Sequence, residues 1–202
     1  MPEKKQLKVV ANISRGTTGA RLSDPRDATE EVRVVQPVNL GSSGFEGQLA
    51  RTTVARYRLD KYHLNRGDIL VSLLDAPETP LRVSVLRETR LEGSLLVAGA
   101  NVAIVRLTSE RDFDHHYLAC YLRSQAAARQ LRSARAGTLQ SYLNVVALGE
   151  LLIPLLPIGE QKRVAELDLA YADYARETQQ LLVAERHLLH AHFEQQFGGK
   201  GG

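Results

Sequence analysis

Short apolar runs, separated by segments rich in glycine, proline and polar residues, dominate the chain up to residue 107. Some runs are apolar almost throughout, as in residues 69–74, and others alternate between apolar and polar positions, as in residues 81–86. Runs of this length, flanked by turn residues, are typical of β-strands. The predicted strands are residues 32–38, 69–74, 81–86, 95–97 and 102–107, with residues 7–13 as a short strand or helical turn.

After residue 107 the apolar residues recur at helical spacing instead. Asp112 or Asp114 provides a cap for a helix that continues to about residue 134 and ends at Gly137. A proline-limited run at residues 151–156 follows, and we expect it to form an edge strand or an extended crossover. Strands early and helices late indicate an α+β fold, in which a mixed β-sheet packs against helices. The face of the first helix comprises Leu118, Tyr121, Leu122, Gln125 and Ala128.

The longest pattern is a helix from about residue 160 to residue 197 that contains neither glycine nor proline. At about 1.5 Å per residue this helix is roughly 57 Å long. Its apolar residues keep a period near 3.6, which places them on one face. A helix of this length cannot fold back over so small a domain, so the face needs a second helix, which we expect from another chain. The residues of this face are Val164, Leu167, Tyr171, Tyr174, Leu182, Leu189, Phe193 and Phe197.

Composition narrows the class of protein. At 202 residues, with 44% hydrophobic and 24% charged residues, the chain is ordinary for a globular protein. No run approaches the ~20 apolar residues of a membrane span, and the lysine-rich start lacks the apolar core of a signal peptide. The single cysteine, Cys120, excludes a disulfide framework and a cysteine-rich metal site. We therefore expect a cytoplasmic protein with no membrane partner.

The net charge of +3 is unevenly distributed. Residues 1–66 carry 12 Lys or Arg and 7 Asp or Glu, so this block has a net charge of +5. Residues 67–159 carry nine of each sign, and residues 160–202 carry five basic and seven acidic residues. The basic excess lies in the N-terminal third, where a polyanion is expected to bind first.

Motifs for common catalytic sites are absent from the sequence. It contains no P-loop, dinucleotide-binding turn, zinc-protease helix or serine-hydrolase elbow, and no Asp/Asn-Pro-Pro-aromatic tetrapeptide of amino-methyltransferases. The pair His115 and His116, near Asp112 and Asp114, is the remaining candidate for metal binding or acid–base chemistry. Neighbouring residues of a regular helix point to different faces, so both imidazoles cannot bind one ion. We therefore predict a protein without catalytic activity, metal or cofactor of its own.

Arginines are better candidates for a binding role, because clustered guanidinium groups neutralise phosphates and bond guanine edges. They gather around the first glycine loop, around Tyr57, and every third residue near the end of the first helix. The turn after that helix offers polar side chains for base or phosphate contacts. The alternative is that these charges form only a solvated face. The predicted DNA-binding residues are Arg15, Thr17, Arg21, Arg26, Arg51, Arg56, Arg58, Arg66, Arg129, Arg132, Arg135, Gln140 and Ser141.

The order of several segments resembles a known family. Residues 64–71 (LNRGDILV) and 101–107 (NVAIVRL) come first in the chain. They precede Gly137, Gln140 and Leu143, and then Ile153, Pro154, Pro157, Ile158, Glu160 and Gln161 at the start of the long helix. Together these segments span nearly the whole chain, and they are similar to the DNA-specificity (S) subunit of type I restriction–modification systems.

The resemblance implies that residues 1–157 form a target-recognition domain, residues 158–197 the long conserved helix and residues 198–202 a flexible tail. Such an S subunit has two domains and two antiparallel helices, so the chain resembles half of one and would read one half of a bipartite site. By the same resemblance its partners are double-stranded DNA, adenine-N6 methyltransferase subunits that bind S-adenosylmethionine, and a restriction or translocase subunit. The helix would pair in a homodimer or with a second half-subunit.

Two alternatives remain open. A related methylation-based phage-defence system can use the same fold. In the other alternative the chain is a protein-interaction module that docks a partner through the 160–197 helix, and the basic N-terminal third is incidental.

Overall fold

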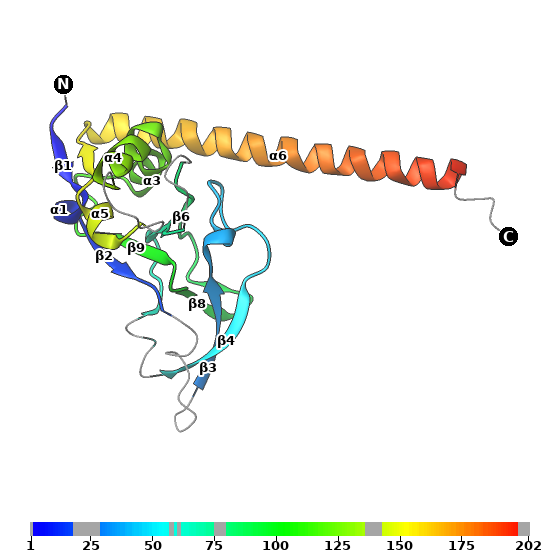
Figure 1. Cartoon of the computed structure of the whole chain (residues 1–202), viewed down its shortest axis with the longest axis horizontal. Helices are drawn as coiled ribbons and strands as arrows, with labels where there is room; N and C mark the ends of the chain where they lie inside the picture. The colour runs from blue at the N-terminus through cyan, green and yellow to red at the C-terminus, as the bar shows by residue number, and fades with distance from the viewer. Residues whose placement is uncertain are drawn as a thin grey trace.

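A computed structural model describes residues 2–17, 29–56, 59, 62–74, 80–135 and 143–197. One long helix projects from a body of two four-stranded sheets, a two-stranded sheet and short helices (Figure 1). The predicted α+β class is confirmed. The elements are β1 (Lys4–Gln6), α1 (Leu7–Val10), β2 (Ala11–Arg15), β3 (Thr29–Val35), η2 (Pro37–Asn39), β4 (Ala50–Ala55), β5 (Ile69–Ser72), β6 (Val83–Val85), β7 (Arg90–Leu91), β8 (Ser94–Ala98), β9 (Val102–Leu107), α3 (His115–Arg123), α4 (Gln125–Arg135), α5 (Val145–Gly149), β10 (Leu152–Pro154) and α6 (Ile158–Phe197).

The first four-stranded sheet has the order β2-β9-β5-β6 and is antiparallel throughout. Its inner strands are buried on both faces. Ile69 and Val71 pack with Leu118 on the helical side, whereas Leu70 and Ile104 pack with residues of the second sheet. Because both faces are covered, these strands are apolar throughout, as the sequence pattern predicted.

The second four-stranded sheet has the order β4-β3-β8-β7 and is mixed, because β3 and β8 run parallel while the other pairs are antiparallel. The strand predicted for residues 32–38 ends at Val35, since Pro37 begins the short helix η2. The β7–β8 hairpin turns at Glu92 and Gly93, which both have positive φ (50° and 82°). Two consecutive residues of this kind match the twist of an antiparallel pair.

The proline-limited run pairs at the edge of the fold, as predicted. Its strand β10 forms a two-stranded antiparallel sheet with β1, in which Ile153 lies opposite Lys5. The segment 7–13 contains both of its predicted structures, because the single helical turn α1 leads directly into β2.

The single helix predicted from residue 114 to residue 134 is wrong, because two helices occupy this segment. Asp114 caps α3, as predicted, and accepts hydrogen bonds from the main-chain N–H groups of His116 and Tyr117, both at 2.9 Å. Ser124 then adopts an extended conformation with ψ of 156°, which ends α3. The Ser124 hydroxyl accepts a bond from Ala127 N at 3.2 Å and so begins α4. Gly137, the predicted end, lies outside the described residues.

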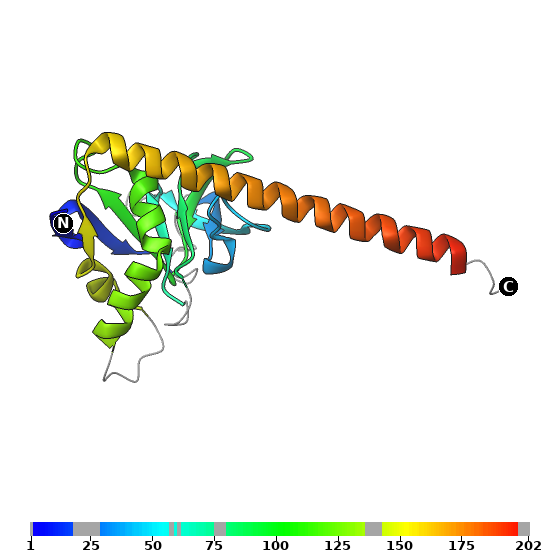
Figure 2. The same ribbon diagram turned by 90° about the horizontal axis from the view of Figure 1, so that it is seen from above.

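Helix α6 runs for 40 residues, as predicted for this segment. Its first turns pack against α3, and the rest extends away from the body (Figure 2). Every residue from 179 to 197 is exposed. In the described ranges no helix combines the length and apolar composition that crossing a membrane requires. The predicted tail, residues 198–202, lies outside the described residues.

Candidate nucleic-acid interface

Arg15, the last residue of β2, holds a neighbouring turn with its guanidinium group. Its Nε donates to the main-chain oxygen of Ala100, and its Nη2 donates to Asn101 Oδ1 at 3.1 Å. Thr17 lies just beyond and is buried, and its N–H donates to Ala98 O at 2.9 Å. Arg15 is therefore exposed and held in position, whereas Thr17 has little surface to offer to DNA.

Arg51 on the outer strand β4 and Arg56, which directly follows this strand, lie among carboxylates. Arg51 is 3.7 Å from Glu31 Oε1 and 3.6 Å from Glu92 Oε2, and Arg56 is 4.0 Å from Glu30 Oε2. Both arginine side chains stay mostly exposed, at 60% and 71%. Exposed ion pairs contribute only ~0–1 kcal/mol, so a phosphate can compete for these arginines. The carboxylates nevertheless lower the positive charge of this strand.

Arg66 lies in a recess formed by the turn before β5, the end of β6, the start of α3 and one side of α6. Its polar lining is Arg66, Arg87, Glu110, His115 and His116, with Gly67 at its base. We call it the arginine recess. Arg66 and Arg87 are both exposed, and neither forms an ion pair with any described residue. The two guanidinium groups thus remain available to an anion.

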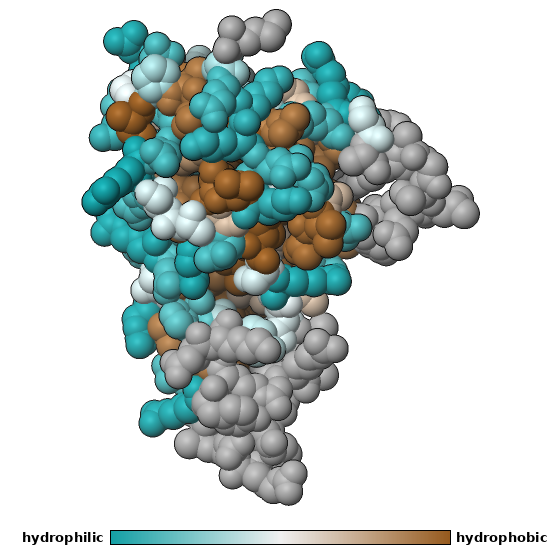
Figure 3. All heavy atoms as spheres, turned by 90° about the vertical axis from the view of Figure 1, so that its left-hand side faces the viewer, coloured by the Kyte–Doolittle hydropathy of each residue, from teal (hydrophilic) through white to brown (hydrophobic). Residues whose placement is uncertain are grey.

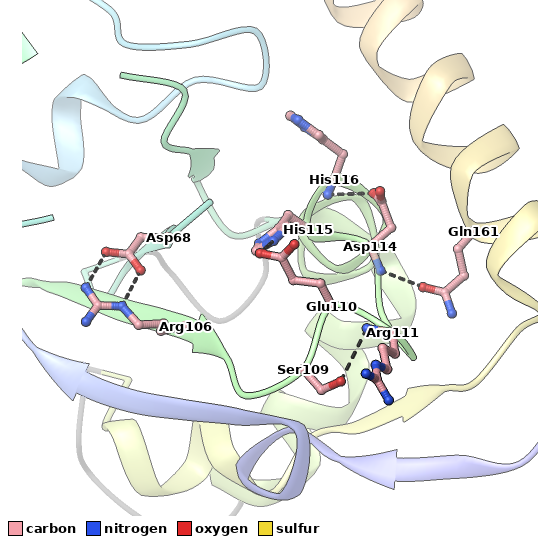
Figure 4. A network of polar contacts seen from close by, with 9 residues as sticks. All are labelled: Asp68, Arg106, Ser109, Glu110, Arg111, Asp114, His115, His116 and Gln161. Carbon is pink, nitrogen blue, oxygen red and sulfur yellow. Dashed lines mark hydrogen bonds and ion pairs between the residues drawn. The ribbon is translucent and has the colours of Figure 1, made fainter. Parts of the chain in front are cut away.

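The two histidines of the arginine recess differ in their surroundings (Figure 4). His115 Nε2 is 3.1 Å from Glu110 Oε1, and its ring lies against Gly67, where a Cβ would approach Cε1 to 2.8 Å. Burial lowers the pKa of His116; Asp114 opposes this shift, and the positive charge of Arg87 reinforces it. No group of three His, Cys, Asp or Glu side chains in the described part of the chain could hold a metal ion.

Arg129 and Arg132 lie on α4, which has one buried face. That face comprises Ala127, Ala128 and Leu131, while Arg129 is exposed and Arg132 is half-buried. Arg135 ends the helix. The side chain of Arg135 and the predicted residues Arg21, Arg26, Arg58, Gln140 and Ser141 lie outside the described residues.

The predicted DNA-binding residues that the structure describes thus lie on several different elements of the body. Arg87 is a candidate that the sequence analysis missed. Its only signal in the sequence is its position directly after an alternating strand, and its closeness to Arg66 depends on the pairing of β5 with β6.

Most of the apolar face predicted on α6 is open to solvent, and we call these exposed residues the arm stripe. The exposed fractions are 68% for Leu167, 72% for Tyr171, 68% for Tyr174, 54% for Leu182, 55% for Leu189 and 51% for Phe193. Phe193 also stacks on Phe197, with ring centroids 5.9 Å apart. Val164 differs from the others, because it is half-buried and packs against the core of the body. Exposed apolar area of this extent marks an interaction surface.

A second exposed apolar surface lies at the end of the body opposite the tip of α6. Figure 3 shows apolar side chains among polar ones on this end, which is formed by β1, α1, α5 and β10. Val9 and Val146 are 63% and 70% exposed there. Val146 also lines a groove between β2 and α5, together with Ile13 and Val145.

Comparisons with known proteins identify the fold. No protein-family model and no curated protein matches the chain. Among solved structures, the type I restriction–modification S subunit from M. genitalium matches with a TM-score of 0.60 and 14% identity, over 98% of this chain and 46% of that one. A structure from a study of complex assembly and conformational transition of the type I system matches with a TM-score of 0.55 and 16% identity, over 96% of this chain and 43% of that one.

The resemblance inferred from the sequence is therefore confirmed at the level of the fold. The match includes the long helix, since nearly the whole chain is covered. The chain has the fold of a type I restriction–modification S subunit and spans less than half the length of the S subunit it matches.

Proposed function

We propose that the chain is a sequence-specific DNA-recognition subunit of a type I restriction–modification complex or a related methylation-based phage-defence complex. It reads one half of a bipartite site and recruits adenine-N6 methyltransferase subunits, and through them a restriction or translocase subunit. The chain itself is non-catalytic, and S-adenosylmethionine binds to the methyltransferase.

The observation that carries this proposal is the fold match over 98% of the chain. Independent support comes from the arm stripe, because a long helix with an exposed apolar face requires a partner helix. Exposed arginines without carboxylate partners, such as Arg66 and Arg87, suit the phosphate contacts that dominate DNA affinity.

In this proposal the chain divides at residue 157. Residues 1–157 form the target-recognition domain, and residues 158–197 form the partner helix, with the arm stripe as its contact surface. The domain contacts DNA through the predicted residues other than the buried Thr17, and we add Arg87 to them.

The partner helix comes from a second copy of the chain or from a second half-subunit. A two-fold dimer presents two identical recognition domains, and symmetric proteins bind symmetric half-sites. A homodimer should therefore prefer an interrupted palindrome, and a hetero-pair should prefer two different half-sites.

Selection from a random duplex library tests the proposal. The chain is mixed with its cognate adenine-N6 methyltransferase, and bound duplexes are recovered in the presence of competitor DNA at several salt concentrations. We expect enrichment of one bipartite sequence and a steep loss of affinity with salt. Equal recovery of all sequences, or no retained duplex at low salt, would contradict the proposal.

The second candidate is a protein-interaction module, and two observations favour it. Carboxylates surround Arg51 and Arg56, and a second apolar surface lies near Val146. A module of this kind binds a protein through α6 and needs no DNA. The selection above separates the candidates, because a module recovers no duplex although its protein partner is present.

A further inference from the structure

Helix α6 joins the body through a fully buried glutamine. Gln161 has no exposed surface, and its amide bonds only main-chain groups. Its Oε1 accepts from Asp114 N at 2.9 Å (Figure 4). Its Nε2 donates to Asp112 O at 2.7 Å and to Leu156 O at 2.8 Å. An amide is the only side chain of this size that both accepts and donates in this way, so glutamate would lose both donated bonds.

An ion pair holds α6 two turns further along. Arg123 of α3 pairs with Asp168 through Nη2, and its Nη1 donates to Val83 O of β6 at 3.0 Å. The two side chains are only 16% and 22% exposed. Arg123 therefore ties α6 to both α3 and the first four-stranded sheet.

Small side chains complete this contact. Ala165 and Ala172 are buried, at 4% and 5% exposure, and they allow close approach to the body. Gln161, Ala165, Asp168 and Ala172 follow each other at helical spacing, so they lie on one face of α6. We call this face the arm root; it differs from the arm stripe, which stays exposed alongside it.

The arm root is short compared with the helix that it holds. From Ala172, the last buried residue, the helix extends a further ~37 Å to Phe197 at about 1.5 Å per residue. A tilt of about 10° at the root would move the tip by about 6 Å, which is roughly two base pairs at 3.4 Å each. Small changes of angle at the root thus become displacements of the tip that are comparable with the rise of one to two base pairs.

We infer that Gln161 and the Arg123–Asp168 pair are positioning residues that fix the angle of α6 and thereby select the spacing between half-sites. This inference rests on the proposed function. Its physical basis is that hydrogen bonds and ion pairs are directional, whereas alanine contacts alone would allow the helix to rock on the body.

A distance measurement tests the positioning without DNA. Spin labels are placed on the body at Thr53→Cys and on the arm at Gln180→Cys, and the labelled chain is diluted into unlabelled chain. Burial raises the pKa of the Cys120 thiol to about 11, so this cysteine reacts slowly with thiol labels at neutral pH. We expect a narrow distance distribution that Gln161→Leu broadens.

Two further variants sharpen the measurement. Gln130→Ala is the matched control, because Gln130 also makes three hydrogen bonds, to Tyr121 Oη and the main chain of Leu152, but none to α6. It should leave the distribution narrow. Ala172→Leu removes no hydrogen bond but adds a larger side chain between α6 and the body at the far end of the arm root, so it should shift the mean distance. This variant keeps the test decisive even if Gln161→Leu fails to fold.

The same variants are then assayed in the methyltransferase complex on duplexes in which the selected half-sites are joined by spacers of varying length. Wild type and Gln130→Ala should accept one spacer length, Gln161→Leu about two or three adjacent lengths, and Ala172→Leu a different length, with unchanged half-site sequences. Unchanged distances, or unchanged spacer preference despite changed distances, would overturn the inference. If wild type selects no half-site, the proposed function fails, and the distances alone decide whether the root positions the arm.

Discussion

Asp68 organises the turn in the segment LNRGDILV through its buried carboxylate. The Asp68 carboxylate is buried, accepts from Asn65 N at 2.7 Å and bonds Arg106 through both oxygens at 2.7 Å. Asp68 N in turn donates to Asn65 O at 3.0 Å, and Gly67 has a φ of +88°. The glycine and aspartate therefore shape the turn that precedes β5, and the aspartate links this turn to β9 through Arg106.

Substitution of Asp68 should destabilise the fold. Asp68→Ala leaves Asn65 N and the half-exposed Arg106 without their acceptor, and we expect a loss of about 1–3 kcal/mol in the free energy of unfolding. Urea unfolding measures this loss. Glu110→Ala is the control, because Glu110 is 77% exposed and should change the free energy by less than about 0.5 kcal/mol. Equal unfolding midpoints for both variants would show that the Asp68 pair contributes little.

His116 should make stability depend on pH. Its pKa is lowered in the folded state, first by burial and then by Arg87, His115 and Arg123, against the opposing charge of Asp114. The folded protein therefore resists protonation, so stability is full above about pH 6.5 and falls as the pH drops through the lower folded value.

Replacement of the histidine tests this pH dependence. The urea midpoint of wild type should decrease from about pH 7.5 to about pH 5.5, and His116→Gln should make this decrease smaller. His187→Gln, on the exposed part of α6, should leave the decrease unchanged. Arg87→Gln should raise the pKa of His116 toward its ordinary value, as measured by NMR titration of the imidazole. If the pKa of His116 is the same in wild type and in Arg87→Gln, the two groups do not interact in the arginine recess.

At the scale of elements, the sequence correctly predicted the strands and helices whose residues form one clear local pattern. Strands β5 and β9 are buried on both faces and therefore read as unbroken apolar runs, and α6 has no glycine or proline over 38 predicted residues. The break at Ser124 was missed, because serine within a helical pattern gives no local sign of an extended conformation. The carboxylates around Arg51 were missed too. Glu92 lies close to Arg51 only because β3 pairs in parallel with β8, and this pairing cannot be predicted from the local sequence.

The arm stripe gives a prediction for a whole element. Tyr174→Glu places a carboxylate in the stripe, where a partner helix would bury it, and should weaken pairing by about 2–3 kcal/mol, or roughly 30- to 150-fold in dissociation constant. Gln180→Glu adds the same charge to the exposed opposite side of α6 and is the control. Analytical ultracentrifugation over a dilution series, alone and with candidate partner chains, measures the pairing. Equal weakening by both variants would indicate a general effect of charge instead of a buried stripe.

At the scale of the whole molecule, charge and shape divide the chain in the same place. The first 159 residues carry all of the positive excess, and residues 160–202, most of which form α6, carry five basic and seven acidic residues. A polyanion is therefore attracted to the body, while the arm remains free for a helix of another chain. In the proposed function, the body is the surface that binds DNA and the helix sets the geometry of assembly.

Salt dependence distinguishes a specific phosphate contact from this general attraction. Each phosphate that a protein neutralises contributes about 0.9 to the slope of log affinity against log salt. Arg87→Gln should lower that slope by about 1 if the arginine recess binds the DNA backbone. Arg186→Gln makes the same change in net charge on the exposed arm and should leave the slope unchanged. Equal effects of the two substitutions would mean that the body attracts DNA through its overall charge, and that the recess makes no contact of its own.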